Sequence, residues 1–92
     1  MAILSRGQID VALRDLPGWR FDNNALVKEF TFAGFPEAVA FVSRLVPGSE
    51  AADHHPDLAV SYRRVTVAFT THSEGGVTAK DLAGARLADS CA

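Results

Sequence analysis

Residues 58–71, Leu-Ala-Val-Ser-Tyr-Arg-Arg-Val-Thr-Val-Ala-Phe-Thr-Thr, contain two segments in which large apolar side chains recur at every second position. This period of two predicts two half-buried β-strands, 58–62 and 65–71, with Arg63-Arg64 as the turn between them. Continuing this hairpin outward places His55 opposite His72. Within it, the apolar residues pair on one face: Tyr62 with Val65, Val60 with Val67, and Leu58 with Phe69.

Capping signals predict a helix near each end of the chain. Ser5 and Gln8 have the spacing of a capping box, so a helix should begin there and end before Pro17-Gly18. Thr78 and Asp81 form a second capping box, which predicts a last helix over about residues 79–90.

The middle of the chain predicts a second hairpin and a longer helix. Strands 19–21 and 25–32 flank the turn residues Asp22-Asn23-Asn24. Pro36 suits a first helical position, but Pro47-Gly48 falls inside the helix that follows. Because proline removes a backbone hydrogen bond, we expect a kink or a break before Ser49. The apolar stripe of this helix, which we expect to pack on the sheet, is Ala38, Phe41, Val42, Leu45 and Val46.

The predicted order of elements is therefore helix, two strands, helix, two strands, helix. This order predicts an α+β fold in which three helices pack on one face of a four-stranded antiparallel sheet. A chain of 92 residues is large enough for one core, so we expect a single domain over residues 1–92.

Composition disfavours nucleic-acid and membrane partners and indicates the cellular compartment. The net charge is −2, from 9 basic and 11 acidic residues that are interspersed, which disfavours direct binding to nucleic acid or to a membrane surface. The single Cys91 cannot form an intramolecular disulfide, which suits a reducing compartment. There is no apolar run of about 18 residues and no leader-like start, so we expect a cytoplasmic protein.

All three histidines lie in one stretch, and histidine can both give and take a proton near neutral pH. The spacing Glu50-x3-His54-His55-Pro56-x5-Tyr62-x9-His72-x8-Asp81 resembles the active-site signature of the pterin-4a-carbinolamine dehydratases. Several fixed positions and gaps agree at once, which makes this likeness more specific than one short motif. It extends over almost the full length, through Leu16-Pro17-Gly18-Trp19, the stretch from Phe30 to Phe41, and Gly76-Val77-Thr78.

The resemblance implies the same fold and a hydro-lyase activity. Enzymes of this family remove water from 4a-hydroxytetrahydropterin to give quinonoid dihydropterin, in the recycling of tetrahydrobiopterin for aromatic amino acid hydroxylases. By resemblance, His54 and His72 donate protons at the carbinolamine hydroxyl, and His55 binds and orients the pterin. Asp81 would hold a catalytic histidine, and Glu50 is a weaker candidate for substrate binding. Two acid/base groups suffice for this reaction, so no metal or organic cofactor is expected.

The resemblance also implies a homodimer or homotetramer, and an open sheet leaves edges that such pairing would cover. A non-enzymatic binding or assembly module is the alternative function, because members of the family serve as protein partners, including in dimerisation of a transcription factor. An adapter without catalytic duty would be expected to lose histidines, and this chain has kept all three. This favours the enzyme and leaves a protein partner open.

Three further interpretations compete at single residues. Zinc is disfavoured because the neighbours His54 and His55 project in different directions and seldom reach one metal ion. Asp81 has a sufficient role in capping its own helix, so the sequence leaves its catalytic role open. We interpret Trp19 and Tyr62 as packing aromatics rather than as residues that stack on a pterin.

Overall fold

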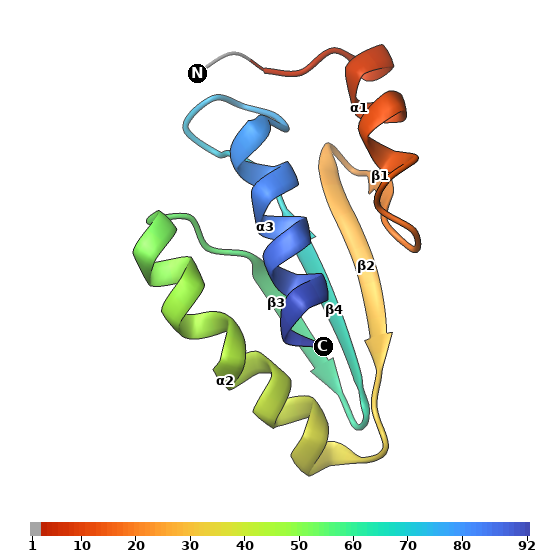
Figure 1. Cartoon of the computed structure of the whole chain (residues 1–92), viewed down its shortest axis with the longest axis vertical. Coiled ribbons are helices and arrows are strands. Elements are labelled where there is room, and N and C mark those ends of the chain that lie inside the picture. Colours follow the sequence, from red (N-terminus) through yellow and green to blue (C-terminus); the bar gives the residue numbers. More distant parts are fainter. Residues whose placement is uncertain (1–2) are drawn as a thin grey trace.

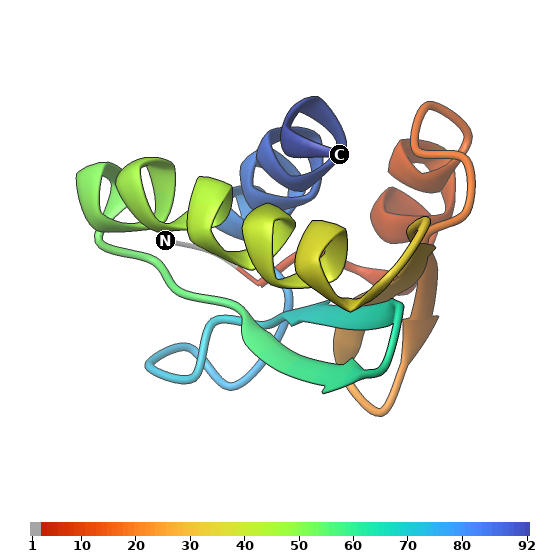
Figure 2. The same cartoon turned by 90° about the horizontal axis from the view of Figure 1, so that it is seen from below.

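The computed structural model describes residues 3–92 and has the predicted order of elements (Figure 1). The sheet order is β1-β2-β4-β3, every neighbouring pair is antiparallel, and the three helices lie on the same side of the sheet (Figure 2). The predicted α+β fold is confirmed. Within residues 3–92, no helix is both long enough and apolar enough to cross a lipid bilayer. The elements are α1 (Arg6–Leu13), β1 (Arg20–Asp22), β2 (Ala25–Thr31), α2 (Phe35–Ala52), β3 (Asp57–Ser61), β4 (Arg64–Phe69) and α3 (Ala79–Cys91).

Both predicted capping boxes are present. The backbone N–H of Gln8 donates to the Ser5 hydroxyl at 3.1 Å, and the Ser5 N–H donates to the Gln8 side chain at 2.8 Å. Thr78 and Asp81 make the equivalent pair of bonds at the start of α3. These bonds satisfy backbone donors that have no partner inside a helix, which is why both helices begin where the sequence indicates.

The core lies between the helices and the sheet. The Phe30 ring on β2 contacts the Phe41 ring on α2 with 4.8 Å between centroids, and Trp19 lies edge-on to Phe30. The predicted stripe of α2 is only partly buried, because Val46 at its margin is 55% exposed. The buried apolar residues of the cluster are Ile9, Leu16, Trp19, Leu26, Phe30, Ala38, Phe41, Leu45, Val65, Val67, Phe69, Val77, Ala85 and Ala88.

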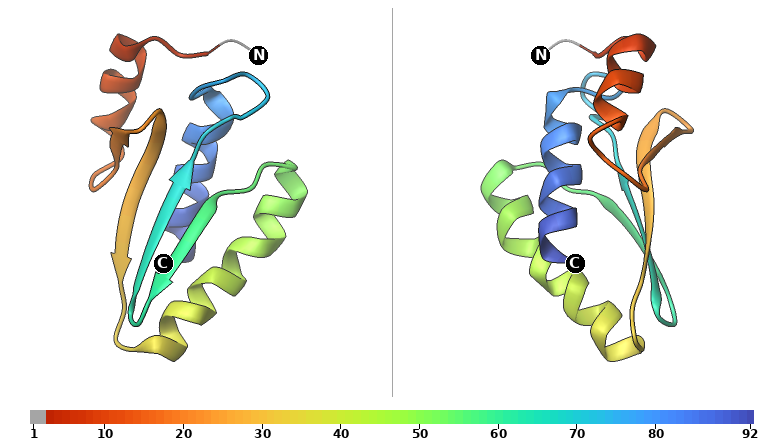
Figure 3. Two further views of the ribbon diagram at one scale, coloured as in Figure 1. Left: turned by 180° about the vertical axis from the view of Figure 1, so that it is seen from behind. Right: turned by 45° about the vertical axis from the view of Figure 1, so that its right-hand side comes forward.

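Polar contacts fix the last helix to the sheet as well. The indole N–H of Trp19 donates to both carboxylate oxygens of Asp89 at 3.1 Å, and the Lys28 ammonium on β2 lies 2.8 Å from the same carboxylate. Figure 3 shows β2 and β4 running along α3. These contacts therefore join the helix layer to the sheet.

The register predicted for the second hairpin is wrong by two residues. Val60 pairs with Val65, and the turn is Tyr62-Arg63, where Tyr62 has a φ of 54°. A shift of two residues keeps every side chain on its face, so the alternation of the sequence fits both registers equally well. Tyr62 is 68% exposed in this turn, so its interpretation as a packing aromatic is also wrong. The strand β3 begins at Asp57, so His55 is not part of the ladder.

Of the kink or break expected before Ser49, the break is wrong, because α2 continues through Pro47 to Ala52. A proline inside a helix removes one backbone hydrogen bond, and the packing of a long helix can compensate for that loss. Gly48 supports the packing, since a Cβ at this position would lie 2.7 Å from the Leu87 side chain of α3. The two helices therefore approach closely at the point where a break was expected.

We predict that Gly84→Ala destabilises the protein by about 1–3 kcal/mol, which is the usual cost of overpacking. A Cβ at Gly84 would lie 2.5 Å from the nearest ring carbon of Phe69, a side chain that is 1% exposed. The better helix propensity of alanine, worth up to about 1 kcal/mol, opposes this cost only in part. The free energy of unfolding is measured by urea denaturation.

Gly7→Ala is the matched control, because the nearest atom to a Cβ at Gly7 is the Ser5 hydroxyl oxygen at 3.9 Å. This variant should be neutral or slightly more stable, since alanine loses less backbone entropy in a helix. Equal stability of the two variants would contradict the close contact between α3 and Phe69.

Candidate active site

The end of α2 directs the chain into the two adjacent histidines. Asp53 takes a left-handed conformation with a φ of 49°, and its N–H bonds to the Glu50 carbonyl. The N–H of His54 then bonds to the Ser49 carbonyl at 3.1 Å. Such bonds satisfy the last carbonyls of a helix and fix the direction in which the chain leaves it. The position of His54 therefore depends on how α2 ends.

His54 is held by a buried carboxylate. Its Nε2 lies 2.6 Å from Oδ1 of Asp81, and the His54 side chain is 12% exposed while that of Asp81 is 0% exposed. The His54 ring also stacks on Phe69, with 6.0 Å between centroids and 24° between planes. These contacts come from α3 and β4, so two elements distant in sequence orient one imidazole.

The second oxygen of Asp81 is already occupied by two donors. Oδ2 accepts the Thr71 hydroxyl at 2.8 Å and the Thr78 backbone N–H at 2.9 Å. Because a carboxylate only accepts hydrogen bonds, Oδ1 receives the N–H of His54 Nε2, which leaves Nδ1 of a neutral His54 as a proton acceptor. Asp81 therefore caps its helix and orients His54 at the same time.

His55 faces a different carboxylate. Its Nε2 contacts Oε2 of Glu50, one turn back in α2, and both side chains are largely exposed. Glu50 does not line the same pocket as His54, but lies beside an apolar pocket of about 210 Å³ between α2 and β3. The structure thus places Glu50 next to His55 and apart from the other predicted site residues.

His72 lies at the start of the loop that joins β4 to α3. This loop is closed by a bridge between Thr71 and Gly76, and Gly75 takes a φ of 77°, which glycine adopts without strain. The His72 side chain is 80% exposed, and its Nε2 lies 4.0 Å from Asp57. Water screens such an exposed pair, so this contact holds the imidazole only weakly.

The three histidines line one pocket of about 360 Å³, which we call the histidine pocket. Each histidine faces a different acidic residue: His54 faces Asp81, His55 faces Glu50, and His72 faces Asp57. Among residues 3–92, no three His, Cys, Asp or Glu side chains are arranged to hold a metal ion. The remaining lining residues are Asp53, Thr70, Thr71, Ser73 and Lys80.

Sequence reasoning missed Thr71, Lys80 and Asp57. The signal for Thr71 was present, because it continues the alternation of Val67 and Phe69 and so puts a polar residue at a buried position. No comparable signal marked Lys80 or Asp57, which are exposed charged residues whose place beside the histidines depends on the tertiary fold.

A family model described as pterin 4 alpha carbinolamine dehydratase matches residues 2–91 of the chain. The chain belongs to this family. The resemblance seen in the spacing of Glu50, the histidines and Asp81 is therefore confirmed as a family relationship.

Curated relatives in the pterin-4-alpha-carbinolamine dehydratase family span the same length. A protein of Metallosphaera sedula is 51% identical over 89 residues, which cover 97% of this chain and 93% of the relative. A protein of Mycobacteroides abscessus is 44% identical over 89 residues, covering 97% and 95%. Both carry the name pterin-4-alpha-carbinolamine dehydratase as a provisional one.

A crystal structure of a family member has the same fold. The protein from Brucella melitensis, described as a transcriptional coactivator/pterin dehydratase, matches with a TM-score of 0.94 and 35% sequence identity. The match covers 99% of both chains. This dehydratase-family chain thus shares its fold with that protein over almost its whole length.

We predict that Thr71→Val lowers the free energy of unfolding by about 1–3 kcal/mol, because it leaves the buried Asp81 carboxylate without one of its donors. Valine has the same shape as threonine, so the loss measures the hydroxyl group rather than packing. Thr70→Val is the matched control, since the Thr70 hydroxyl makes an exposed bond to the Asn24 carbonyl. Equal losses in urea denaturation would mean that the Asp81 network does not stabilise the fold.

Proposed function

We propose that this protein dehydrates a 4a-hydroxytetrahydropterin to quinonoid dihydropterin and water by histidine acid/base catalysis. The observation that carries the proposal is His54, backed by the buried Asp81 and opening into a pocket shared with His55 and His72. Membership of the dehydratase family supports the reaction class.

The reaction needs two proton transfers and no change of oxidation state. The hydroxyl group on the ring carbon leaves with an added proton, and a ring N–H loses its proton as the new double bond forms. One group must therefore act as an acid and one as a base, each suited to neutral pH. Histidine fits both roles, so the proposed reaction needs neither a metal nor an organic cofactor.

We assign proton transfer to His54 and His72. His54 is fixed by Asp81 through Nε2, so its Nδ1 is the nitrogen available for exchange with the substrate. His72 is exposed and can renew its proton from water. His55, with Glu50 beside it, would bind and orient the pterin at the exposed edge of the histidine pocket. Asp81 would act as a positioning residue, as a carboxylate does behind a catalytic imidazole elsewhere.

We place this reaction in the recycling of a tetrahydrobiopterin-type cofactor in the cytoplasm, in the form of a homodimer or homotetramer. The strand β3 lies at the edge of the sheet and all five of its residues are exposed, as is Val46 on α2. An open edge beside apolar side chains is a surface that pairing with a second copy would cover.

A second candidate function is binding to a protein partner. One observation favours it: the Brucella melitensis relative is described as a transcriptional coactivator as well as a pterin dehydratase. The two functions are not exclusive, and an assay of dehydration tests the first of them.

We predict that the protein accelerates the dehydration of synthetic 4a-hydroxytetrahydropterin, followed by the absorbance of the quinonoid product. His54→Ala and His72→Ala should each lower the rate by about 10² to 10⁴, because each removes one acid/base group. Arg63→Ala, in the turn between β3 and β4, is the control and should keep the wild-type rate. A folded wild-type protein that does not exceed the spontaneous rate would reject the enzyme and leave the protein-binding function.

We predict that Asp81→Asn lowers the rate about 10²-fold or more while the protein remains folded. The amide oxygen can still accept the bonds from Thr71 and Thr78, but its NH₂ group would face His54 Nε2 and force the other tautomer. Nitrogen chemical shifts of the His54 ring, measured by NMR, report this change directly. A variant that loses thermal stability but keeps the rate and the tautomer would make Asp81 a helix cap only.

A further inference from the structure

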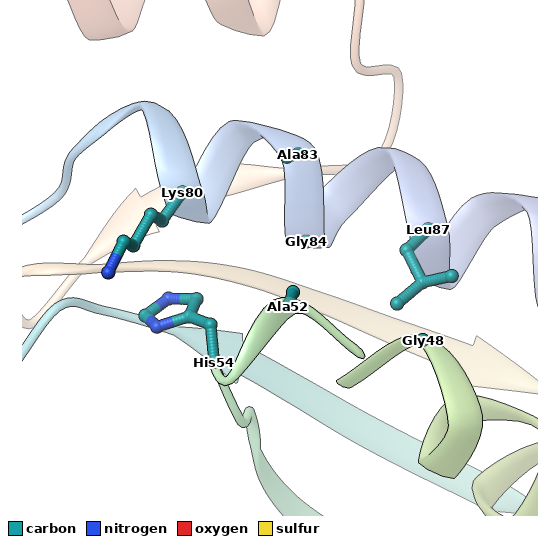
Figure 4. A pocket seen from close by; sticks show the side chains of 7 residues that line it. All are labelled: Gly48, Ala52, His54, Lys80, Ala83, Gly84 and Leu87. Carbon is teal, nitrogen blue, oxygen red and sulfur yellow. The ribbon is translucent and has the colours of Figure 1, made fainter. Parts of the chain in front are cut away.

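The two walls of the histidine pocket are built from different parts of the fold. One wall carries His54, whose imidazole is held by Asp81. Figure 4 shows His54 together with Lys80 at one end of a small apolar groove of about 270 Å³ between α2 and α3, and both residues line the groove as well as the pocket. The other wall is the loop of residues 72–76, which carries His72. The position of His72 therefore depends on a loop rather than on packed helices.

His72 lacks the tight side-chain contact that holds His54. Its Nε2 lies 4.0 Å from the Asp57 carboxylate, and the two side chains are 80% and 76% exposed. Because water screens an exposed pair of this kind, the contact orients the imidazole only weakly. The direction of the His72 side chain therefore follows mainly from the backbone of the loop.

Hydrogen bonds within the loop give it its shape. The N–H groups of Gly75 and Gly76 both donate to the Thr71 carbonyl, at 2.9 Å and 3.3 Å, and the Thr71 N–H donates to the Gly76 carbonyl at 3.0 Å. These bonds join the loop only to Thr71, just after β4. Two adjacent glycines add backbone freedom, so a contact from another element is needed to fix the loop against the rest of the sheet.

Asn24, in the turn between β1 and β2, supplies such a contact. Its side-chain Nδ2 donates to the Gly75 carbonyl at 2.9 Å, and its own backbone carbonyl accepts the Thr70 hydroxyl at 2.9 Å. A Cβ at Gly76 would lie 3.6 Å from the Asn24 side-chain oxygen, so the amide also lies close to that part of the loop. Thr70 precedes His72 and Gly75 follows it. One residue of a distant turn thus holds the backbone on both sides of His72.

We propose that Asn24 is a positioning residue for the dehydration, which keeps His72 in its place in the histidine pocket. This inference rests on the proposed function, which assigns proton transfer to His72. Asn24 does not line the pocket, so it acts on the reaction through the loop alone. A misplacement of about 1 Å caused far from the reacting atoms can lower a rate by about 100-fold, so such a contact can control kcat.

The test compares Asn24→Gly with Asn23→Gly, its matched control. Both asparagines have a positive φ, 60° and 49°, which glycine adopts without strain. The Asn23 side chain makes no hydrogen bond within residues 3–92, so only Asn24→Gly removes a bond to the loop. We expect kcat for 4a-hydroxytetrahydropterin to fall about 10-fold in Asn24→Gly, with KM changed less than about 2-fold. Asn23→Gly should keep both constants.

Two further measurements distinguish positioning from a general structural role. When His72 is already replaced in His72→Ala, adding Asn24→Gly should cause no further loss of rate, because the imidazole that Asn24 positions is absent. Backbone order parameters of residues 72–76, measured by ¹⁵N NMR relaxation, should fall toward about 0.6 in Asn24→Gly and stay near about 0.85 in Asn23→Gly.

The outcomes separate the role of Asn24 from the proposed function. An unchanged kcat in Asn24→Gly, an equal fall in Asn23→Gly, or a full additional loss in the His72→Ala background would overturn the positioning role while the dehydratase stands. A wild-type protein without activity would reject the proposed function itself. The order parameters then decide: a loop that loosens in Asn24→Gly alone supports Asn24 as the anchor of His72, and an unchanged loop overturns it. Urea denaturation checks that each variant remains folded.

Discussion

The buried carboxylate of Asp81 joins the helix α3, the end of β4 and the histidine pocket in one hydrogen-bond network. A buried carboxylate is costly unless donors satisfy it, and here the Thr71 hydroxyl, the Thr78 N–H and the His54 imidazole all donate to it. Each donor comes from a different segment of the chain. Removing any one donor leaves the buried Asp81 carboxylate incompletely satisfied. Stability of the fold and orientation of His54 therefore depend on the same carboxylate.

The two ends of the site are brought together by helix packing. The helix α2 continues through Pro47 and ends at the left-handed Asp53, which turns His54 toward α3. Glycines at 48 and 84 allow α3 to lie close to both α2 and the Phe69 ring. As a result, His54 and His55 from the end of α2 meet His72 from the loop after β4, and a small apolar groove opens beside them.

The three histidines differ in their burial and in their partners, and the spacing of the sequence motif does not reveal these differences. His54 is almost enclosed and has a buried partner, His55 has an exposed partner in Glu50, and His72 is open to water. Such differences are consistent with three separate roles: His54 as an oriented proton carrier, His55 as a binding group, and His72 as a group that exchanges protons with solvent. Membership of the dehydratase family agrees with this division without assigning the roles.

The sequence by itself determined the order of elements, both capping boxes, the buried face of β4 and the family, because these depend on local spacing and periodicity. It did not determine the hairpin register, since a shift of two residues leaves the alternation unchanged, or the continuity of α2, since contacts with α3 compensate for Pro47. Only the tertiary structure decided that Asp81 both caps α3 and holds His54, and that Lys80 lies at the junction of pocket and groove. Those features depend on which segments, distant in sequence, pack together in the fold, and local sequence patterns do not specify that packing.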